Sequence, residues 1–273
     1  MAALAAMVVG ANAQTPVERG SYLVNTIGTC QNCHTPAGPG GPVLDRAFSG
    51  GPQVWDTPMF TARGANITQD RETAIGAWSI LELKKALIEG VRPNGVPIAP
   101  IMPTAYYGVL TERDRDAIAA YLKTVKAVRN EVPSPTYKTA IVREIPPGGD
   151  KQMTDAELTD PVNKGFYLAT FGHCMECHTP RGATGQSDFS RLGAGGEEFQ
   201  GPWGVSVSRN ITSHQTKGIG AWTDAQIKAA ITDGVRPDGT KLKPPMGFGS
   251  YKRMTDADLT AVVAWLRTVP AKE

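Results

Sequence analysis

Apolar side chains recur at helical spacing in three stretches of the first half of the chain and in three stretches of the second half. The stretches cover residues 17–27, 79–90, 111–125, 162–171, 223–234 and 255–268. In the second of them Ile80, Leu83 and Leu87 lie three and four residues apart, which is the period of a helix with one buried face. No run of alternating apolar and polar residues indicates a strand, so the pattern predicts an all-α fold.

Start and stop signals flank the second stretch of each half. Ser79 is followed three positions later by Glu82, which is the capping-box pattern of a helix N-terminus. Gly90 stands where this helix must end, because glycine readily adopts the left-handed conformation that terminates helices. The same signals recur in the second half at Thr223, Gln226 and Gly234. These residues place one helix of about three turns in each half.

The two halves are copies of one unit. Many positions recur 144 residues later, which is the offset between Cys30 and Cys174 (174 − 30). The matched segments are Asn66-Ile67-Thr68 with Asn210-Ile211-Thr212, Ile75-Gly76-Ala77-Trp78 with Ile219-Gly220-Ala221-Trp222, Gly90-Val91-Arg92-Pro93 with Gly234-Val235-Arg236-Pro237, Met102 with Met246, Tyr107 with Tyr251, and Asp114 with Asp258. Because each copy exceeds about 100 residues, the pattern indicates a tandem duplication of domains and excludes a solenoid of short repeats.

A stretch rich in proline and glycine separates the copies. It covers residues 127–160 and predicts an extended linker on the protein surface, with a short helical turn opening at residues 154–157. We therefore divide the chain into an N-terminal segment 1–13, a first domain 14–126, the linker 127–160 and a second domain 161–273.

The N-terminal segment has the features of the end of a secretory signal peptide. Its residues are small and apolar, and Ala11-Asn12-Ala13 forms an A-x-A cleavage signal before Gln14. This predicts export to the periplasm with cleavage after Ala13. No other segment approaches the length of a transmembrane helix, so we expect no transmembrane segment in the chain itself.

Composition narrows the classes of function. The hydrophobic fraction of 41% is ordinary, so the chain can bury a core. The formal net charge is +2, which argues against a nucleic-acid partner, because such proteins carry strongly basic surfaces.

The chemistry of the chain is concentrated in two pentapeptides, which use all four cysteines. Cys30-Gln31-Asn32-Cys33-His34 and Cys174-Met175-Glu176-Cys177-His178 are both C-x-x-C-H, the attachment signature of c-type haem. In this signature two thiols bind the two vinyl groups on one edge of the porphyrin, and the adjacent histidine becomes an axial iron ligand. The motifs predict two covalently bound haem c groups, with His34 and His178 as proximal ligands. The alternatives are a zinc site or a thioredoxin-like dithiol.

A ligating imidazole normally donates its other N–H to a carbonyl or a carboxylate. The residues two positions after the ligands are Pro36 and Pro180, and we expect their carbonyl groups to accept this bond.

The second axial ligand must come from elsewhere in each copy. Met102 and Met246 both follow their histidine by 68 residues (102 − 34; 246 − 178) and both lie in proline-rich loops. A rigid loop suits a thioether held at an iron, so we predict Met102 and Met246 as distal ligands. The alternative is that they are flexible core residues.

Other repeated polar and aromatic residues have two interpretations. Either they bond the haem propionates or the methionine sulfur, or they maintain the fold, which we favour for the asparagines. They are Asn66, Asn210, Trp78, Trp222, Arg92, Arg236, Tyr107 and Tyr251. His173 and His214 have no counterpart at the 144-residue offset, and we interpret them as ordinary polar residues.

The order of C-x-x-C-H-T-P, N-I-T, I-G-A-W, G-V-R-P and P-x-M in each copy resembles the cytochrome c subunits of bacterial periplasmic alcohol, gluconate, sorbitol and aldehyde dehydrogenases. Many of those subunits carry a third haem motif and a C-terminal membrane anchor, whereas this sequence has two motifs. The resemblance implies two tandem class I cytochrome c-like domains. It also implies electron transfer from a periplasmic or membrane-associated dehydrogenase subunit to another cytochrome, a terminal oxidase or a quinone.

Two classes of function remain open. The first is an electron carrier that is not itself an enzyme, with two axial ligands at each iron. The second is a dihaem enzyme such as a peroxidase or a thiosulfate dehydrogenase, which needs an open iron. A methionine candidate in both copies favours the carrier.

Overall fold

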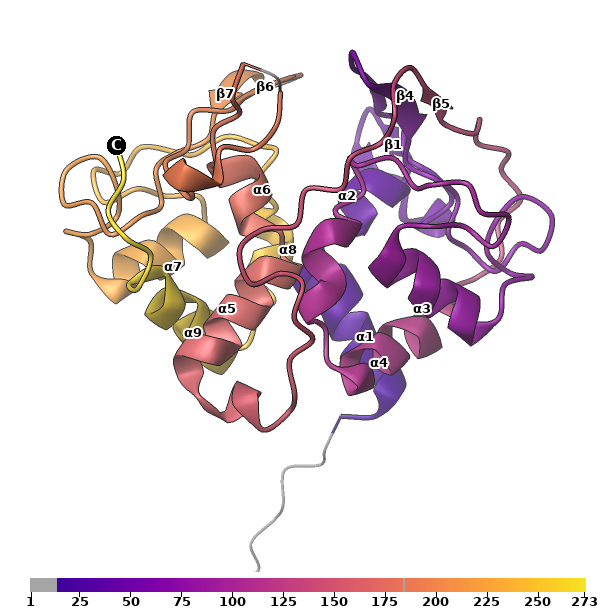
Figure 1. Ribbon diagram of the computed structural model, residues 1–273, viewed down its shortest axis with the longest axis horizontal. Coiled ribbons are helices and arrows are strands. Elements are labelled where there is room, and N and C mark those ends of the chain that lie inside the picture. Colours follow the sequence, from indigo (N-terminus) through magenta and orange to yellow (C-terminus); the bar gives the residue numbers. More distant parts are fainter. Residues whose placement is uncertain (1–13, 184) are drawn as a thin grey trace, which may run out of the picture.

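The computed structural model describes residues 14–183 and 185–273, and it consists of two mainly helical halves that lie side by side (Figure 1). The predicted signal peptide lies outside the described residues. In each half the first and the last long helix cross at the base, and the loops and short strands rise above them (Figure 1).

The first half contains the three predicted helices and additional short ones. Thr15 and Glu18 form a capping box at the start of the first helix. The Ser79–Glu82 capping box and the left-handed Gly90 bound the second one as predicted. The elements are α1 (Pro16–Tyr22), η1 (Leu23–Ile27), α2 (Gln31–His34), η2 (Leu44–Arg46), α3 (Ile80–Glu89), η3 (Thr104–Val109) and α4 (Glu112–Leu122).

The second half repeats this order. The Thr223–Gln226 capping box starts its middle helix, and Gly234 follows the helix with φ 61°. The elements are α5 (Pro161–Phe171), α6 (Cys174–His178), η5 (Phe189–Arg191), α7 (Asp224–Thr232), α8 (Phe248–Tyr251) and α9 (Asp256–Leu266).

A glycine allows the two long helices of each half to cross closely. A Cβ atom on Gly20 of α1 would lie 1.9 Å from the carbonyl oxygen of Ala117 of α4. A Cβ atom on Gly165 of α5 would lie 1.9 Å from the carbonyl oxygen of Ala261 of α9. Any side chain at these two glycines would therefore push the helices apart.

The first helix differs between the halves by one residue. Gly20 precedes Cys30 by ten positions (30 − 20), whereas Gly165 precedes Cys174 by nine (174 − 165). The extra residue is accommodated in the π-helical turn η1, where the amide of Gly28 donates to the carbonyl of Leu23, five residues back, at 2.8 Å. The glycine crossing and the cysteines thus keep equivalent places in both halves.

Short strands correct the expectation of a purely helical fold. β3 (Val54–Asp56) and β4 (Phe60–Arg63) form a hairpin in the first half, and β6 (Glu198–Gly201) and β7 (Gly204–Val207) form the equivalent hairpin in the second. A smaller pair consists of β1 (Ala37–Gly38) and β2 (Gly41–Pro42). These strands span two to four residues, which is too short for an alternating pattern to stand out in the sequence.

The linker is partly built into the first half, which refines the expectation of a surface segment. It contributes β5 (Thr136–Tyr137), which pairs with β4, and the short helix η4 (Glu157–Thr159). Met153 is buried, and its amide donates to the carbonyl of Val109 at 2.9 Å. The linker therefore joins the two halves and also covers the first one.

The halves share one apolar core. The rings of Tyr107 and Phe171, from opposite halves, lie 5.1 Å apart between centroids. The buried cluster around them includes Leu23 and Val109 from the first half and Leu168 and Val263 from the second. The two halves are therefore packed together and not merely tethered.

Polar bonds cross this interface reciprocally. The hydroxyl of Tyr22 donates to Asp258 at 2.7 Å, and the hydroxyl of Tyr167 donates to Asp114 at 2.6 Å. Each carboxylate also binds a cation of its own half: Asp114 binds Arg19 at 3.0 and 2.7 Å, and Asp258 binds Lys164 at 2.5 Å. We call the two hydrogen bonds from Tyr22 to Asp258 and from Tyr167 to Asp114 the tyrosine–aspartate contacts.

Candidate haem sites

The two C-x-x-C-H motifs lie on short helices, α2 and α6, that follow a sharp backbone turn. Thr29 and His173 stand at equivalent positions before the first cysteine and have φ values of 46° and 45°. This left-handed conformation is uncommon for residues other than glycine, and its recurrence in both copies marks a constrained site. The turn separates each cysteine-bearing helix from the helix before it.

Burial favours the protonated form of the thiols in both motifs. Burial raises the pKa of Cys30 to about 12 and that of Cys33 and Cys174 to about 11. Burial raises the pKa of Cys177 as well. A redox-active dithiol needs a lowered pKa, because the thiolate is the nucleophile. The structure therefore does not support the thioredoxin-like alternative.

The histidines are held by backbone carbonyl groups, but not by those predicted. The Nδ1 atom of His34 lies 2.7 Å from the carbonyl oxygen of Ala65, and that of His178 lies 2.6 Å from the carbonyl oxygen of Arg209. A carbonyl oxygen can only accept, so each Nδ1 carries the proton and each Nε2 keeps a lone pair for a metal. Burial lowers the pKa of both imidazoles, which favours this neutral form.

The predicted acceptors, the carbonyl groups of Pro36 and Pro180, accept hydrogen bonds from backbone amides instead. The amide of Val43 donates to Pro36 at 2.8 Å, and that of Asp188 donates to Pro180 at 2.8 Å. These bonds close the loops that follow each motif. Sequence proximity was therefore misleading, and the signal that marks the true acceptors is the repeated Asn-Ile-Thr segment directly after them.

The repeated asparagines hold the acceptor segments in place. The side-chain amide of Asn66 donates to the carbonyl oxygens of Val128 at 2.8 Å and Asn130 at 3.1 Å. In the second half, Asn210 donates to the carbonyl oxygen of Lys272 at 2.7 Å. The asparagines tie the carbonyl that orients each histidine to the chain beyond the last helix of the domain. This agrees with the structural role that the sequence favoured.

The two candidate methionines lie in equivalent loops. Each loop is anchored at its start, because the amides of Ile98 and Leu242 donate to the carbonyls of Gly90 and Gly234 at 2.7 Å. Each loop then leads through the half-buried Met102 or Met246 to a short helix, η3 or α8. These helices carry Tyr107 and Tyr251.

The tyrosines of these short helices lie where burial disfavours their charged form. Burial raises the pKa of Tyr107 and that of Tyr251.

The repeated arginines and tryptophans contact the fold around these loops. Arg92 donates to the carbonyl oxygen of Pro97 at 3.0 Å across the turn that follows α3. The carbonyl oxygens of Trp78 and Trp222 accept from the side chains of Lys123 and Arg267 on the last helix of each half. These contacts support the fold-maintaining interpretation of Arg92 and of the two tryptophan positions.

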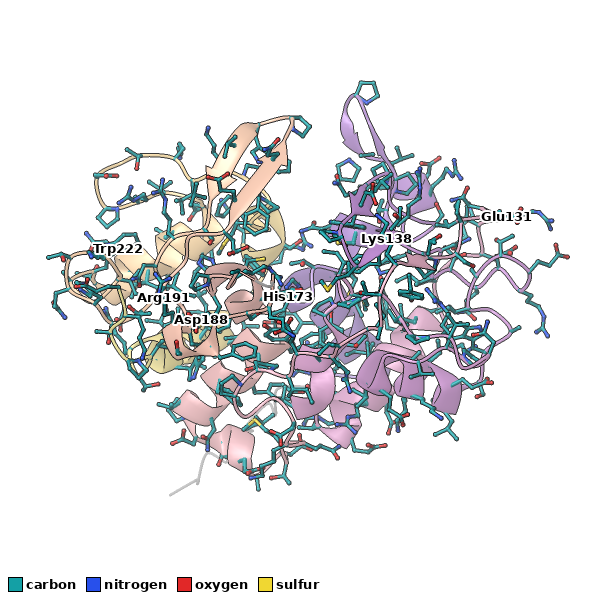
Figure 2. The ribbon with its side chains drawn as sticks, turned by 45° about the horizontal axis from the view of Figure 1, so that its top comes forward. Glu131, Lys138, His173, Asp188, Arg191 and Trp222 are labelled. Carbon is teal, nitrogen blue, oxygen red and sulfur yellow. The ribbon has the colours of Figure 1, made fainter. Side chains whose placement is uncertain are left out.

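The two motifs meet at the interface between the halves, which the sequence did not indicate. His173 lies near the centre of the molecule, and its Nδ1 is 3.0 Å from the carboxylate of Glu176 (Figure 2). Burial raises the pKa of Cys33, and the charge of Glu176 from the other half adds to this effect. A Cβ atom on Gly247, next to Met246, would lie 3.1 Å from the side chain of Thr29. The two attachment sites therefore lie close to each other at the interface.

Comparison with known proteins identifies the fold family. The cytochrome c family matches residues 17–126 and again residues 162–270. The chain belongs to the cytochrome c family. This cytochrome has two domains, and the matched segments agree with the duplication found in the sequence.

The cytochrome is similar to subunits of several dehydrogenases. It is 31% identical to the fructose dehydrogenase cytochrome subunit of Gluconobacter japonicus, over 96% of this chain and 54% of that protein. It is 30% identical to the cytochrome c subunit of a quinone-dependent alcohol dehydrogenase of Gluconacetobacter polyoxogenes, over 98% of this chain and 60% of that protein. The chain thus spans little more than half the length of these relatives. It is also 29% identical to a diheme cytochrome c of Cereibacter sphaeroides, over 90% of this chain and 83% of that protein.

The cofactors of this cytochrome are two covalently bound haem c groups, one for each domain. The donor set fits them: Cys30, Cys33 and His34 would hold one haem, and Cys174, Cys177 and His178 would hold the other. Within residues 14–183 and 185–273, no cluster of three or more His, Cys, Asp or Glu side chains is arranged to hold a metal ion by itself.

None of the helices in the described part of the cytochrome combines the length and the apolar character needed to cross a membrane.

Proposed function

We propose that this cytochrome is an electron relay of the periplasm. It takes electrons from a partner dehydrogenase, in the periplasm or associated with the membrane, and passes them to another cytochrome, a terminal oxidase or a quinone. The observation that carries the proposal is that the two haem-attachment motifs lie close together at one packed interface. Relatives named as cytochrome subunits of fructose, alcohol and gluconate dehydrogenases support it.

The protein's part in this function is to hold two redox centres at a constant separation. When bound, haem supplies the one-electron chemistry. The carbonyls of Ala65 and Arg209 orient His34 and His178 and keep each Nε2 unprotonated. The shared core and the tyrosine–aspartate contacts keep one domain from moving against the other.

The proposed relay includes a second axial ligand at each iron, which we assign to Met102 and Met246. Each lies in a loop that is anchored at its start by a backbone hydrogen bond and that leads to a short helix, η3 or α8. In this assignment the first domain, residues 14–126, and the second, residues 161–273, each hold one complete haem site. The linker 127–160 joins them.

Replacing either methionine tests the ligand assignment. Met102→Ala and Met246→Ala should each lower the potential of one haem, because a thioether opposite histidine raises the potential of c-type haem. Each variant should also bind carbon monoxide at one of its two haems. Met59→Ala, in the tip of the β3–β4 hairpin, is the matched control. Unchanged potentials in both variants would contradict the assignment.

Purification from the native cell under mild conditions tests the relay itself. We expect a dehydrogenase to co-purify and to reduce both haems when its substrate is added. The reduced cytochrome should then be reoxidised by an added acceptor from the same cell. Turnover of peroxide or thiosulfate by the isolated cytochrome at enzymatic rates would instead establish the dihaem enzyme.

A further inference from the structure

The same hairpin occurs in both domains, but within residues 14–183 and 185–273 a third strand pairs only with the first of them. Residues of β4 and β7 correspond at the 144-residue offset, so that Thr61 matches Val205 (205 − 61). In the first domain β5 pairs with the outer edge of β4 and makes a three-stranded sheet. Among the described residues no strand pairs with the outer edge of β7. Both hairpins rise from the same side of the molecule, at the top of Figure 1.

The cover in the first domain combines backbone pairing with side-chain contacts. Tyr137 and Thr136 of β5 pair with Phe60 and Thr61 of β4. Phe60, Ala62 and Ala99 are buried, and Tyr137 and Ile141 of the linker pack against them. One ion pair completes the contact, with Lys138 of the linker 2.5 Å from Asp56 of β3.

The same surface in the second domain is open. Val205 and Val207 of β7 are 50% and 39% exposed. Val205 lies opposite Gln200, next to the Gly201–Gly204 pair that closes the two-residue hairpin. In an antiparallel ladder such a neighbouring residue directs its N–H and C=O away from the partner strand. An edge of this kind is a template for another strand.

The charge beside this surface differs from that of its counterpart. Lys241 and Lys243 are exposed and occupy the positions of Pro97 and Ala99 (241 − 97; 243 − 99). The Lys243 ammonium donates a hydrogen bond to the carbonyl oxygen of Val205 at 3.4 Å, so it borders the edge of β7. The acidic Asp56 of the first domain is replaced by Gln200. A strand that fits here therefore needs carboxylates near Lys241 and Lys243, where the first domain has the uncharged Pro97 and Ala99.

We propose that the open edge of β7, bordered by Lys241 and Lys243, binds an extended acidic segment of a partner protein by strand addition. Main-chain hydrogen bonds supply the affinity in this mode of recognition, and side chains at alternate positions supply the specificity. The first domain shows the bound form within the same molecule, with its own linker as the added strand.

A partner protein fits this edge better than a second copy of the chain. Two β7 edges paired with each other would bring the lysines of both copies together, and like charges repel. A bound segment would lie close to the second haem site, because the chain leaves β7 at Val207 and two residues later provides the Arg209 carbonyl that orients His178. The surface is thus suited to hold a partner beside one haem.

The test uses the full-length haem-loaded protein and a peptide whose sequence is based on the strand that covers the first domain. The probe is a labelled peptide of residues 133–145 with the changes Lys138→Glu and Arg143→Glu, and the unchanged peptide serves as its comparison. We expect the acidic peptide to bind at least ten times more tightly than the unchanged one in fluorescence anisotropy. Hydrogen exchange should slow in residues 204–207 and stay unchanged in residues 60–63.

Protein variants then locate the site. Lys241→Glu/Lys243→Glu and, separately, Val205→Pro should each weaken binding of the acidic peptide at least tenfold, the second because proline has no N–H. Lys85→Glu/Lys126→Glu makes the same change of charge at exposed positions in the first domain and should leave binding unchanged. Haem content and reduction by dithionite verify that each variant is folded.

Several outcomes would overturn the proposal. They are no binding, equal binding of both peptides, protection outside residues 204–207 and 241–245, and a dimer of the protein that Val205→Pro abolishes. The proposal does not rest on the electron relay, because peptide binding and haem reduction are measured separately and either can fail alone.

Discussion

Two buried carboxylates, Asp114 and Asp258, stand in the first turn of the last helix of each domain. Burial alone would raise the pKa of Asp114, but the hydrogen bonds and charge of Arg19 and the hydroxyl of Tyr167 outweigh it and lower that pKa. A carboxylate with a lowered pKa stabilises the folded state above its unfolded pKa of about 3.9. This stabilisation is lost as the pH falls through the lower, folded-state pKa.

Arg19→Met should make the protein sensitive to acid at a higher pH. The change leaves a buried carboxylate without its cation, which typically costs about 3–5 kcal/mol of unfolding free energy. It also raises the pKa of Asp114, so acid unfolding should begin at a higher pH than in the unchanged protein. Circular dichroism during acid titration measures both effects. Arg129→Met removes an exposed pair with Glu72 and should leave the transition unchanged.

At the scale of single residues, the sequence predicted what local chemistry determines. The spacing of Cys30, Cys33 and His34 identified the attachment site, because the cofactor itself imposes that spacing. The acceptor of the His34 proton was predicted wrongly, because Ala65 lies 31 positions away and reaches the ring through the fold. Such a contact leaves no local pattern, although the repeated Asn66 next to it was a usable signal.

At the scale of elements, helices were predictable and their close contacts were not. Capping boxes and terminal glycines bounded α3 and α7 because these signals act within one turn. The strands were missed because each is at most four residues long. The π-helical turn η1 could not be predicted from the sequence alone. It follows only from the structural equivalence of Gly20 and Gly165 at the helix crossings, which shows that the first domain has one extra residue after Gly20.

Gly20→Ala and Gly165→Ala should each destabilise the domain that contains them. The added methyl would overlap the backbone of the crossing helix, at 1.9 Å from a carbonyl oxygen in both cases. Overpacking of this kind costs about 1–3 kcal/mol and sometimes more. Urea unfolding followed by haem absorbance measures the loss. Gly40→Ala, where a Cβ would meet nothing within 4 Å, should leave stability unchanged, and equal stability of all three variants would contradict the crossing geometry.

At the scale of the whole molecule, the two domains unfold as one unit if the interface is as strong as its contacts indicate. The core runs through both domains, and the tyrosine–aspartate contacts add two hydrogen bonds to buried carboxylates. Burial and the neighbouring Asp258 raise the pKa of Tyr22 to about 12, so its hydroxyl remains a donor at any physiological pH.

The double variant Tyr22→Phe/Tyr167→Phe should uncouple the domains. Each lost hydrogen bond to a carboxylate costs about 1.5–3 kcal/mol, and the loss falls on the interface. We expect the single unfolding transition in urea to separate into two. Electron exchange between the haems should become slower, while the iron ligands stay in place. Tyr137→Phe removes a hydroxyl contact with the Pro97 carbonyl inside the first domain and is the control. A single, unshifted transition in the double variant would show that the apolar core alone joins the domains.

The reciprocal form of the tyrosine–aspartate contacts has a consequence for assembly. In an isologous interface, a tyrosine of one subunit contacts an aspartate of the other, and the same aspartate of the first subunit contacts the same tyrosine of the second. This arrangement is found in two-fold homodimers. Tyr167 and Asp258 belong to the same domain, so two copies of residues 161–273 can form both bonds with each other. We therefore expect this fragment, matured with its haem, to sediment as a dimer in analytical ultracentrifugation, and Asp258→Asn to weaken the dimer. A strictly monomeric fragment would mean that the linker supplies the proximity that identical surfaces cannot.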